Sequence, residues 1–243
     1  MLRIFKPKYL LKDLLPNQYI DIHNHLLPSI DDGPNTAKET MKLISRMKEI
    51  RIEGAIATPH TYIKYWNNTS HNIYCAYGIA KQIEPGKSFL KGYASEYMLD
   101  ASLVARLNKE KLLCIHDTYI LVELPYMGCP LNLYEMLFEL KCKNYKIIIA
   151  HPERYIYFHN SIEKFKKLKL FGVYFQLNLL SLIGYYGKSI QKIAESLIEN
   201  DLYDFTGTDI HNEHHIDQYA TKPIYFNINK IGDLLRANSL FNN

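Results

Sequence analysis

The chain has 243 residues, of which 47% are hydrophobic and 22% are charged. These values are typical of a folded globular protein and exclude a disordered chain, a collagen-like chain and a long coiled coil. The net charge is only +4 and the basic residues form no long block, so a nucleic-acid partner is not indicated. No apolar run approaches the roughly 20 residues that span a bilayer, and residues 1–16 lack the apolar stretch and cleavage site of a signal peptide.

The four cysteines give no sign of a thiolate metal site or of thiol chemistry. Cys75, Cys114, Cys129 and Cys142 form no C-x-x-C pair, and a chain of this length is stable without disulfides. No arginine stands six residues after any of them, so the C-x5-R loop of thiol-dependent phosphatases is absent. We expect reduced thiols and a cytoplasmic location, and the sequence leaves the oligomeric state open.

Short apolar runs that predict buried strands alternate along the chain with stretches that predict helices. The strand runs are 18–22, 54–57, 89–94, 119–124, 146–150, 173–177 and 203–206. The clearest helical stretches are 36–53, 131–144, 162–170 and 188–200. The first of these begins with a capping box, in which Glu39 follows Thr36 by three residues. With no internal repeat and no linker, residues 1–243 are predicted to form a single domain.

Seven strand runs alternating with helices predict parallel βα units, which would fit either a doubly wound sheet or a barrel. Nearly every run ends in a potential metal ligand or another polar residue. In a barrel all strand ends converge on one rim, whereas an open sheet would use only two or three of them. We therefore predict a seven-stranded α/β barrel whose chemistry lies at the C-terminal ends of the strands.

Histidines and carboxylates recur at these strand ends, and together they predict a shared metal centre. In His23-Asn24-His25 the two imidazoles lie on one face of a strand, because side chains alternate with period two. The candidates from the residues alone are His23, His25, Asp31, Asp32, His60, His151, Asp209 and His211. A single residue of this kind is more often a helix cap or a polar strand end. The recurrence of histidines and carboxylates after successive strands favours ligands of Zn, Mn or Fe. Because they exceed the needs of one ion, we expect two or three ions, as in the hydrolysis of phosphate esters.

Arg154 follows His151 by three residues in the sequence His-Pro-Glu-Arg. Beside a metal centre, its planar guanidinium would pair with two oxygens of a bound phosphate. The alternative is a structural salt bridge with Glu153 or Glu163.

The motifs at residues 21–34, 57–60, 151–154, 176–187 and 207–211 together resemble the PHP (polymerase and histidinol phosphatase) superfamily. More narrowly, they are similar to the manganese-dependent tyrosine phosphatases linked to bacterial capsular and exopolysaccharide synthesis. The resemblance runs from about residue 19 to residue 220. It implies a distorted barrel of the PHP type with up to three metal ions, and a phosphotyrosine protein as substrate, such as the tyrosine-rich tail of a bacterial tyrosine kinase.

Carried over by position, the resemblance implies a role for each candidate. His23, His25, Glu96 and Asp209 would bind the first ion, with Glu96 as the bridge. His60, Glu96 and His151 would share the other ions with Asp32 and His211. Arg154 would bind the substrate phosphate beside Asp209 at the catalytic centre.

Two departures from the pattern leave alternatives open. Only 36 residues separate His60 from Glu96, a shorter segment than the resemblance implies, so Glu53, Glu84 and Glu123 compete with Glu96. The resemblance implies an arginine near His214. In its absence, His214 would bind phosphate when protonated, or it would simply face solvent. Two other functions remain: a small-molecule phosphatase such as one acting on histidinol phosphate, and a metal-binding regulatory protein without turnover.

Overall fold

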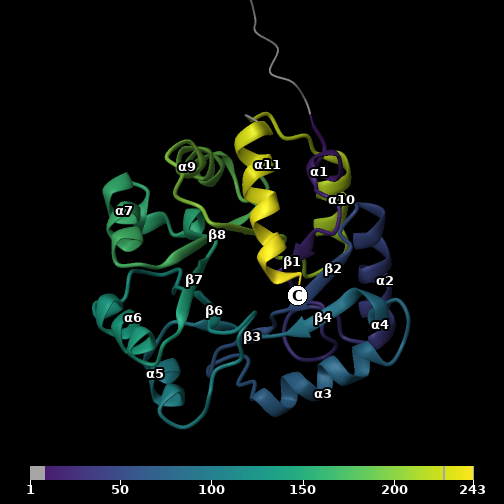
Figure 1. The fold of residues 1–243 in the computed structure, drawn as a ribbon, viewed down its shortest axis with the longest axis horizontal. Helices are drawn as coiled ribbons and strands as arrows, with labels where there is room; N and C mark the ends of the chain where they lie inside the picture. The colour runs from purple at the N-terminus through teal and green to yellow at the C-terminus, as the bar shows by residue number, and fades with distance from the viewer. Residues whose placement is uncertain (1–8, 227, 243) are drawn as a thin grey trace, which may run out of the picture.

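The computed structural model describes residues 9–226 and 228–242, which form two parallel sheets surrounded by helices (Figure 1). The first sheet has the order β1-β2-β4 and the second the order β3-β5-β6-β7-β8-β9. The strands are β1 (Ile20–Asp21), β2 (Gly54–Ala57), β3 (His60–Thr61), β4 (Leu90–Tyr93), β5 (Glu96–Met98), β6 (Tyr119–Glu123), β7 (Lys146–Ala150), β8 (Tyr174–Asn178) and β9 (Phe205–Gly207).

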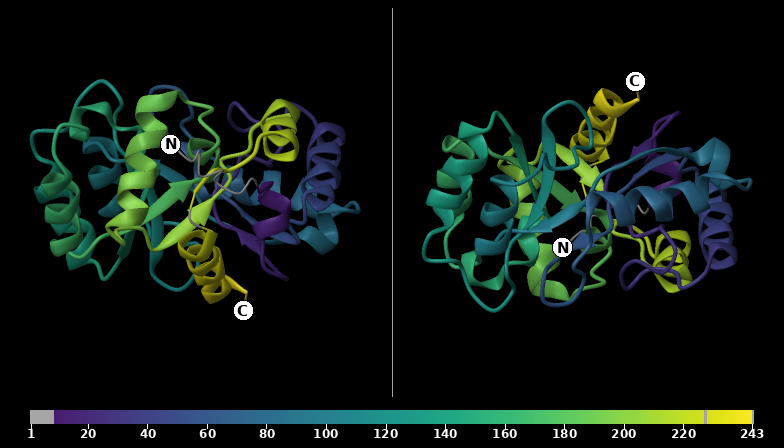
Figure 2. Two further views of the ribbon diagram at one scale, coloured as in Figure 1. Left: turned by 90° about the horizontal axis from the view of Figure 1, so that it is seen from above. Right: turned by 90° about the horizontal axis from the view of Figure 1, so that it is seen from below.

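Helices cover the outside of the two sheets (Figure 2). They are α1 (Leu11–Leu14), α2 (Ala37–Glu49), α3 (Ser70–Lys81), α4 (Gly86–Phe89), α5 (Ala101–Leu107), α6 (Leu133–Cys142), α7 (Ile162–Leu170), α8 (Leu179–Leu182), α9 (Lys188–Glu199), α10 (Glu213–Thr221) and α11 (Ile228–Ala237). Short 3-10 turns, η1 (Pro152–Arg154), η2 (Ile156–Phe158) and η3 (Asn238–Phe241), complete the elements. In the described ranges, no helix has the length and apolar character needed to cross a membrane.

The predicted parallel α/β architecture is confirmed, but the strands are divided differently from the prediction. We predicted seven strands, and the part of the chain described here forms nine. The run at 54–57 continues past Thr58-Pro59 as β3, and the run at 89–94 continues past Ala94-Ser95 as β5. Pro59 has no N–H to donate and interrupts the ladder at the first of these breaks. At both breaks the chain passes from the first sheet to the second.

The two sheets curl so that the β1 edge of the first meets the β9 edge of the second. The chain after β9 runs beside the chain after β1: the Asp209 N–H donates to the His23 carbonyl at 2.7 Å, and the His25 N–H donates to the Ile210 carbonyl at 2.9 Å. Within the first sheet, the β2–β4 pairing extends beyond the strand ends, where the Ala94 N–H donates to the Ala57 carbonyl at 2.7 Å. The strand ends of both sheets therefore face one common interior.

Helix α2 begins as the capping box predicts. The Thr36 hydroxyl accepts from the Glu39 N–H at 3.2 Å, and the Glu39 carboxylate accepts from the Asn35 N–H at 2.7 Å. The predicted end at residue 53 is wrong, because Arg51 adopts a left-handed φ of 67° that no helix continues. Helix α3 was not predicted from the sequence. Tyr74 and Ile79 on its outer face are exposed, and these apolar residues obscure its amphipathic pattern.

An apolar cluster fills the interior below the strand ends. Its residues lie on the same face of each strand as the polar residues of the site. Ile56, Ala94, Leu121, Tyr174 and Phe205 belong to this cluster or pack against it. Two and four residues further along the same strands come the polar side chains Thr58, His60, Glu96, Glu123, Gln176, Asn178 and Asp209. Because side chains alternate with period two, the face that is apolar inside the protein becomes polar at the strand ends.

Candidate metal centre

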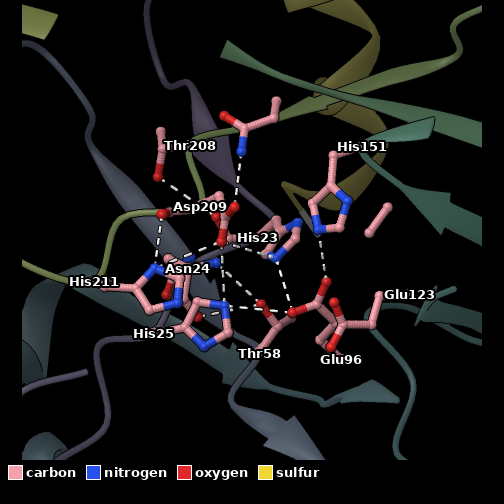
Figure 3. A network of polar contacts seen from close by, with 12 residues as sticks. His23, Asn24, His25, Thr58, Glu96, Glu123, His151, Thr208, Asp209 and His211 are labelled. Atoms are coloured by element: carbon pink, nitrogen blue, oxygen red, sulfur yellow. Dashed lines mark hydrogen bonds and ion pairs between the residues drawn. The ribbon is translucent and has the colours of Figure 1, made fainter. Parts of the chain in front are cut away.

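The predicted ligands meet beyond the ends of β1, β2, β4, β7 and β9. Figure 3 shows six of them pointing toward one another: His23, His25, Glu96, His151, Asp209 and His211. Each comes from a different part of the chain: the segment after β1 (His23, His25), the loop before α2 (Asp32), the starts of β3 and β5 (His60, Glu96), and the segments after β7 and β9 (His151, Asp209, His211). The structure therefore brings all eight predicted ligands together. His60 and Glu96 are direct neighbours because they are register partners in the β3–β5 ladder.

Glu96 lies at the centre of this cluster and is fully buried. Its Oε2 atom is 3.2 Å from His23 Nε2 and 3.1 Å from His60 Nδ1. The same oxygen is 3.5 Å from His25 Nε2, and Oε1 is 3.1 Å from His151 Nε2. One carboxylate thus faces four imidazoles.

Of the three glutamates that compete with Glu96, two do not belong to the cluster. Glu53 and Glu84 are exposed on the surface, whereas Glu123 lies beside Glu96, with its Oε1 atom 3.2 Å from His60 Nδ1. Glu123 is therefore a further candidate ligand that the sequence analysis treated only as a rival. The period-two alternation from Leu121 was the signal that could have found it.

The two oxygens of Asp209 face different partners. Oδ1 is 3.4 Å from both His23 Nε2 and His25 Nε2. Oδ2 accepts from Arg154 Nη1 at 2.8 Å and from Asn178 Nδ2 at 2.7 Å. Asp209 thus joins the candidate metal ligands to the predicted phosphate-binding arginine.

Asp32 and His211 form the outer part of the cluster. His211 Nε2 is 3.3 Å from Asp32 Oδ1, and the His211 ring stacks on that of His25 with 3.8 Å between centroids. His60 Nε2 lies 3.8 Å from the same Asp32 oxygen. His60 thus faces Glu96 with one nitrogen and Asp32 with the other.

Several buried polar atoms of the cluster have no hydrogen-bond partner, and this supports a fit to metal ions. They include His23 Nε2, His25 Nε2, His60 Nδ1 and Glu96 Oε2. A buried polar atom without a partner is costly, and native structures rarely leave one unexplained. The ligand atoms form four overlapping groups, each within 4.8 Å: His25, Asp32, His60 and His211; His23, His25 and Asp209; His23, Glu96 and His151; His60, Glu96 and Glu123. Imidazole and carboxylate are the donors that divalent Mn, Fe and Zn accept.

Neighbouring acceptors orient two of these imidazoles. His25 Nδ1 lies 2.7 Å from Asp31 Oδ2, and His23 Nδ1 lies 2.7 Å from the amide oxygen of Gln176. Because both partners are acceptors, each Nδ1 donates a proton and each Nε2 presents its lone pair to the centre, the usual arrangement around a metal-binding histidine. Asp31, singled out from sequence as a candidate ligand, thus supports His25 instead.

The cluster attracts positive charge strongly. Burial by itself lowers the pKa of His23, but the carboxylates of Glu96 and Asp209 outweigh it and raise the pKa to about 9. Burial likewise opposes ionisation of Glu96, yet His23 and His60 hold its pKa well below its usual range. The same carboxylates that would retain a proton on histidine would also retain a divalent cation.

Arg154 is held between two tyrosines at the edge of the centre. Its guanidinium carbon lies 5.0 Å from the centre of the Tyr126 ring and 4.2 Å from that of Tyr186. Cation–π contacts and the Asp209 ion pair fix its direction. The structural salt bridges considered from sequence are absent in the described residues: Glu153 is bonded by Ser181 and Tyr203, and Glu163 pairs with Lys166.

His214 does not reach the centre. It is exposed on α10, and its Nε2 atom lies 3.4 Å from Gln218 Nε2. Successive residues of a helix point about 100° apart, and it is the buried His215 that faces the centre, where burial lowers its pKa to about 4.

A cavity of about 550 Å³ opens over the cluster. Its lining includes the candidate ligands His60, Glu96, His151 and Asp209, together with Arg154. Six aromatic side chains also line it: Tyr62, Tyr65, Trp66, Tyr126, Tyr185 and Tyr186. The volume is that of a small-ligand site, and its lining combines charged groups with aromatic rings.

Comparison with known proteins places the chain among bacterial tyrosine phosphatases and their relatives in sequence. The family model described as "Capsular polysaccharide synthesis, CpsB/CapC" matches residues 19–243. The tyrosine-protein phosphatase YwqE of Bacillus subtilis is 29% identical over 201 residues, covering 79% of this chain and 77% of the relative. The tyrosine-protein phosphatase CpsB of Streptococcus pneumoniae is 26% identical over 203 residues, covering 79% and 83%.

A solved structure matches as well. It comes from work on YwqE of Bacillus subtilis and CpsB of Streptococcus pneumoniae, described as unique metal-dependent tyrosine phosphatases. It superimposes with a TM-score of 0.73 at 27% identity and covers 89% of this chain and 86% of the other. The curled parallel α/β fold is therefore shared over most of both chains.

Proposed function

The chain belongs to the CpsB/CapC family of capsular polysaccharide synthesis, and we propose that it is a metal-dependent phosphatase that hydrolyses phosphotyrosine in proteins. The observation that carries the proposal is Glu96, buried among four imidazoles beside Arg154. The relatives named tyrosine-protein phosphatases support the substrate. Within this proposal the natural substrate is the tyrosine-rich tail of a bacterial tyrosine kinase that controls capsule or exopolysaccharide synthesis.

The proposal includes two or three ions per chain, of Mn or else of Fe or Zn. His23, His25, Asp209 and Glu96 would hold the first. His60, His151, Asp32 and His211 would share the others with Glu96, and Glu123 is a further ligand on the side of His60. The four overlapping groups of ligand atoms support more than one ion, and the mixture of imidazole and carboxylate suits these metals.

The remaining parts of the proposal concern the frame around the site. We treat the two curled sheets as one distorted seven-stranded barrel, in which β2 with β3 and β4 with β5 each count as one interrupted strand. Residues 1–243 then form one phosphatase domain. We place it in the cytoplasm, where the four free cysteines would stay reduced.

The residues of the chain divide the chemistry among them. Divalent ions in such a site supply a water of lowered pKa and stabilise charge on phosphoryl oxygens. The side chain of Arg154, aimed by Asp209 and by the Tyr126 and Tyr186 rings, neutralises the remaining phosphate charge. The tyrosine phenolate has a pKa of about 10, so it leaves without a strong proton donor.

Paired assays test this function against its rivals. The purified protein is expected to hydrolyse a phosphotyrosine peptide with a catalytic efficiency at least about two orders of magnitude above that for histidinol phosphate, because the aromatic cavity fits an aryl ester. Elemental analysis of the same sample should find more than one ion per chain. The reverse preference would identify a small-molecule phosphatase, and a metal-loaded protein inactive on both would identify a regulatory protein.

Arg154 is expected to contribute through its charge and its fork geometry. Arg154→Lys keeps the charge but loses the bidentate fork, and Arg154→Ala loses both. Catalytic efficiency should fall in the order wild type, Lys, Ala, with the Ala variant losing about 2–4 kcal/mol of transition-state stabilisation. Kinetics on the phosphotyrosine peptide measure this loss, and free phosphate should inhibit the Ala variant more weakly.

The matched control is Arg236→Ala, which removes an exposed arginine paired with Asp233. Metal content should be unchanged in all three variants, because arginine is not a ligand. Normal kinetics in Arg154→Ala, with only a lowered melting temperature, would give Arg154 a purely structural role.

A further inference from the structure

Residues 62–66 form a tight turn beside the cavity, which we call the aromatic turn. The Tyr62 N–H donates to the Trp66 carbonyl at 2.9 Å, and the Trp66 N–H donates to the Tyr62 carbonyl at 2.8 Å. Tyr62, Tyr65 and Trp66 all line the cavity. Three aromatic side chains within five residues are thus turned toward one site.

A buried asparagine holds this turn in place. The amide of Asn68, only 6% exposed, donates to the His60 carbonyl at 2.7 Å and to the Ile30 carbonyl at 2.9 Å. The Asn68 N–H donates to the Trp66 carbonyl at 2.7 Å. The aromatic turn is therefore anchored to the segments that carry the candidate ligands, and its rings need little ordering when a ligand binds.

Trp66 connects the turn directly to the metal centre. Its ring stacks on that of His60, with 4.7 Å between centroids and 11° between planes. His60 in turn lies 3.1 Å from Glu96. The indole ring of Trp66 is therefore in direct contact with a candidate metal ligand.

Two tyrosines of the cavity lining that lie outside the turn already have another contact. Tyr126 and Tyr186 flank the Arg154 guanidinium, so part of their ring surface is already occupied. In the described residues, the ring contacts of the aromatic turn are those among Tyr62, Tyr65 and Trp66 and the stacking on His60. The turn thus has aromatic surface available at the cavity.

We propose that the aromatic turn, with Trp66 at its centre, receives the phenyl ring of the substrate and makes the site selective for aryl over alkyl phosphates. The inference rests on the proposed phosphatase function and adds the residue that decides specificity. In phosphotyrosine a single ester oxygen separates phosphorus from the ring, so phosphate bound between Arg154 and the metal centre brings the ring to the turn. Aromatic pairs attract beyond their buried area, whereas a serine ester would leave the turn in contact with water.

Two inhibitors that differ only in the ring isolate this effect. Phenylphosphonate and methylphosphonate carry the same phosphonate group and have no bond to hydrolyse. Trp66→Ala is expected to weaken inhibition by phenylphosphonate about tenfold, as loss of an aromatic contact implies, and to leave inhibition by methylphosphonate unchanged. Trp66→Phe should restore most of the difference.

The control variant is Tyr74→Ala, which removes an exposed tyrosine of α3 that does not line the cavity. It should leave both inhibition constants as in the wild type. Metal content is measured in each variant, because Trp66 contacts His60. Equal weakening of both phosphonates in Trp66→Ala, or an unchanged ratio between them, would overturn the proposal.

Binding can be measured directly by fluorescence, because Trp66 is the single tryptophan of a chain that also has 20 tyrosines. Its fluorescence can be excited where tyrosine does not absorb. Titration of the metal-loaded wild type with phenylphosphonate should shift or quench this fluorescence, and methylphosphonate should not. A protein that binds neither phosphonate would refute the phosphatase function itself, whereas one that binds both without a fluorescence change would refute only the role of Trp66.

Discussion

Removal of bound metal with EDTA is expected to abolish hydrolysis of the phosphotyrosine peptide. Without divalent cations, His23 Nε2, His25 Nε2, His60 Nδ1 and Glu96 Oε2 face one another with no partner, and the site lacks the charge that would activate water and bind phosphate. The melting temperature should also fall, because an ion that binds only the folded state at 100 times its dissociation constant stabilises it by about 2.7 kcal/mol.

Elemental analysis, activity and melting curves measured on the same samples check this prediction. Restoring Mn²⁺ after dialysis should recover both activity and stability, and this recovery is the control against damage by the chelator. A metal-free protein with full activity would contradict both the metal centre and the mechanism built on it.

Loss of either Asp209 or His151 is expected to lower turnover by at least about two orders of magnitude. Asp209→Ala removes an oxygen that faces His23 and His25 and also the partner of Arg154. His151→Ala removes the imidazole that faces Glu96 Oε1 at 3.1 Å. Asp209→Asn, which keeps the shape but not the charge, should resemble the Ala variant because the cation needs the negative oxygen.

Turnover number and metal content per chain are the two measurements for these variants, with circular dichroism to establish that the fold is intact. His71→Ala and Asp233→Ala, which alter an exposed histidine of α3 and an exposed aspartate of α11, are matched controls and should behave as the wild type. Near-normal turnover with full metal occupancy in either test variant would remove that residue from the catalytic centre.

Much of the site was accessible to sequence reasoning because of two local regularities. Side chains alternate along an extended chain, so His23 and His25 were expected on one face, and both of them face Glu96. Parallel strands end at the same edge, so ligand types that recur after successive strands meet in space. These regularities do not require knowledge of distances, and seven of the eight ligands that they indicated lie in the cluster, Asp31 being the exception.

The positions where the expectations failed depend on geometry that no local pattern contains. Asp31 and Asp32 are adjacent in sequence, but Asp31 supports His25 whereas Asp32 faces His60 and His211. His214 and His215 are adjacent too, and the orientation of α10 gives the site only to His215. A turn or a helix can present either neighbour, and only packing against the rest of the chain selects one.

The sequence by itself indicated the parallel α/β class, the type of ligands at the strand ends and their common edge, because side chains alternate within each strand and parallel strands end at the same edge. The tertiary structure decided which carboxylate stands at the centre, because Glu96 owes its place to its register with His60 across β3 and β5. It also decided that Arg154 lies between Tyr126 and Tyr186 and that Trp66 stacks on His60. The contacts of Arg154 join residues from separate loops, whose relative positions arise only when the two sheets curl around a common interior. The stacking of Trp66 on His60 depends on the turn at residues 62–66.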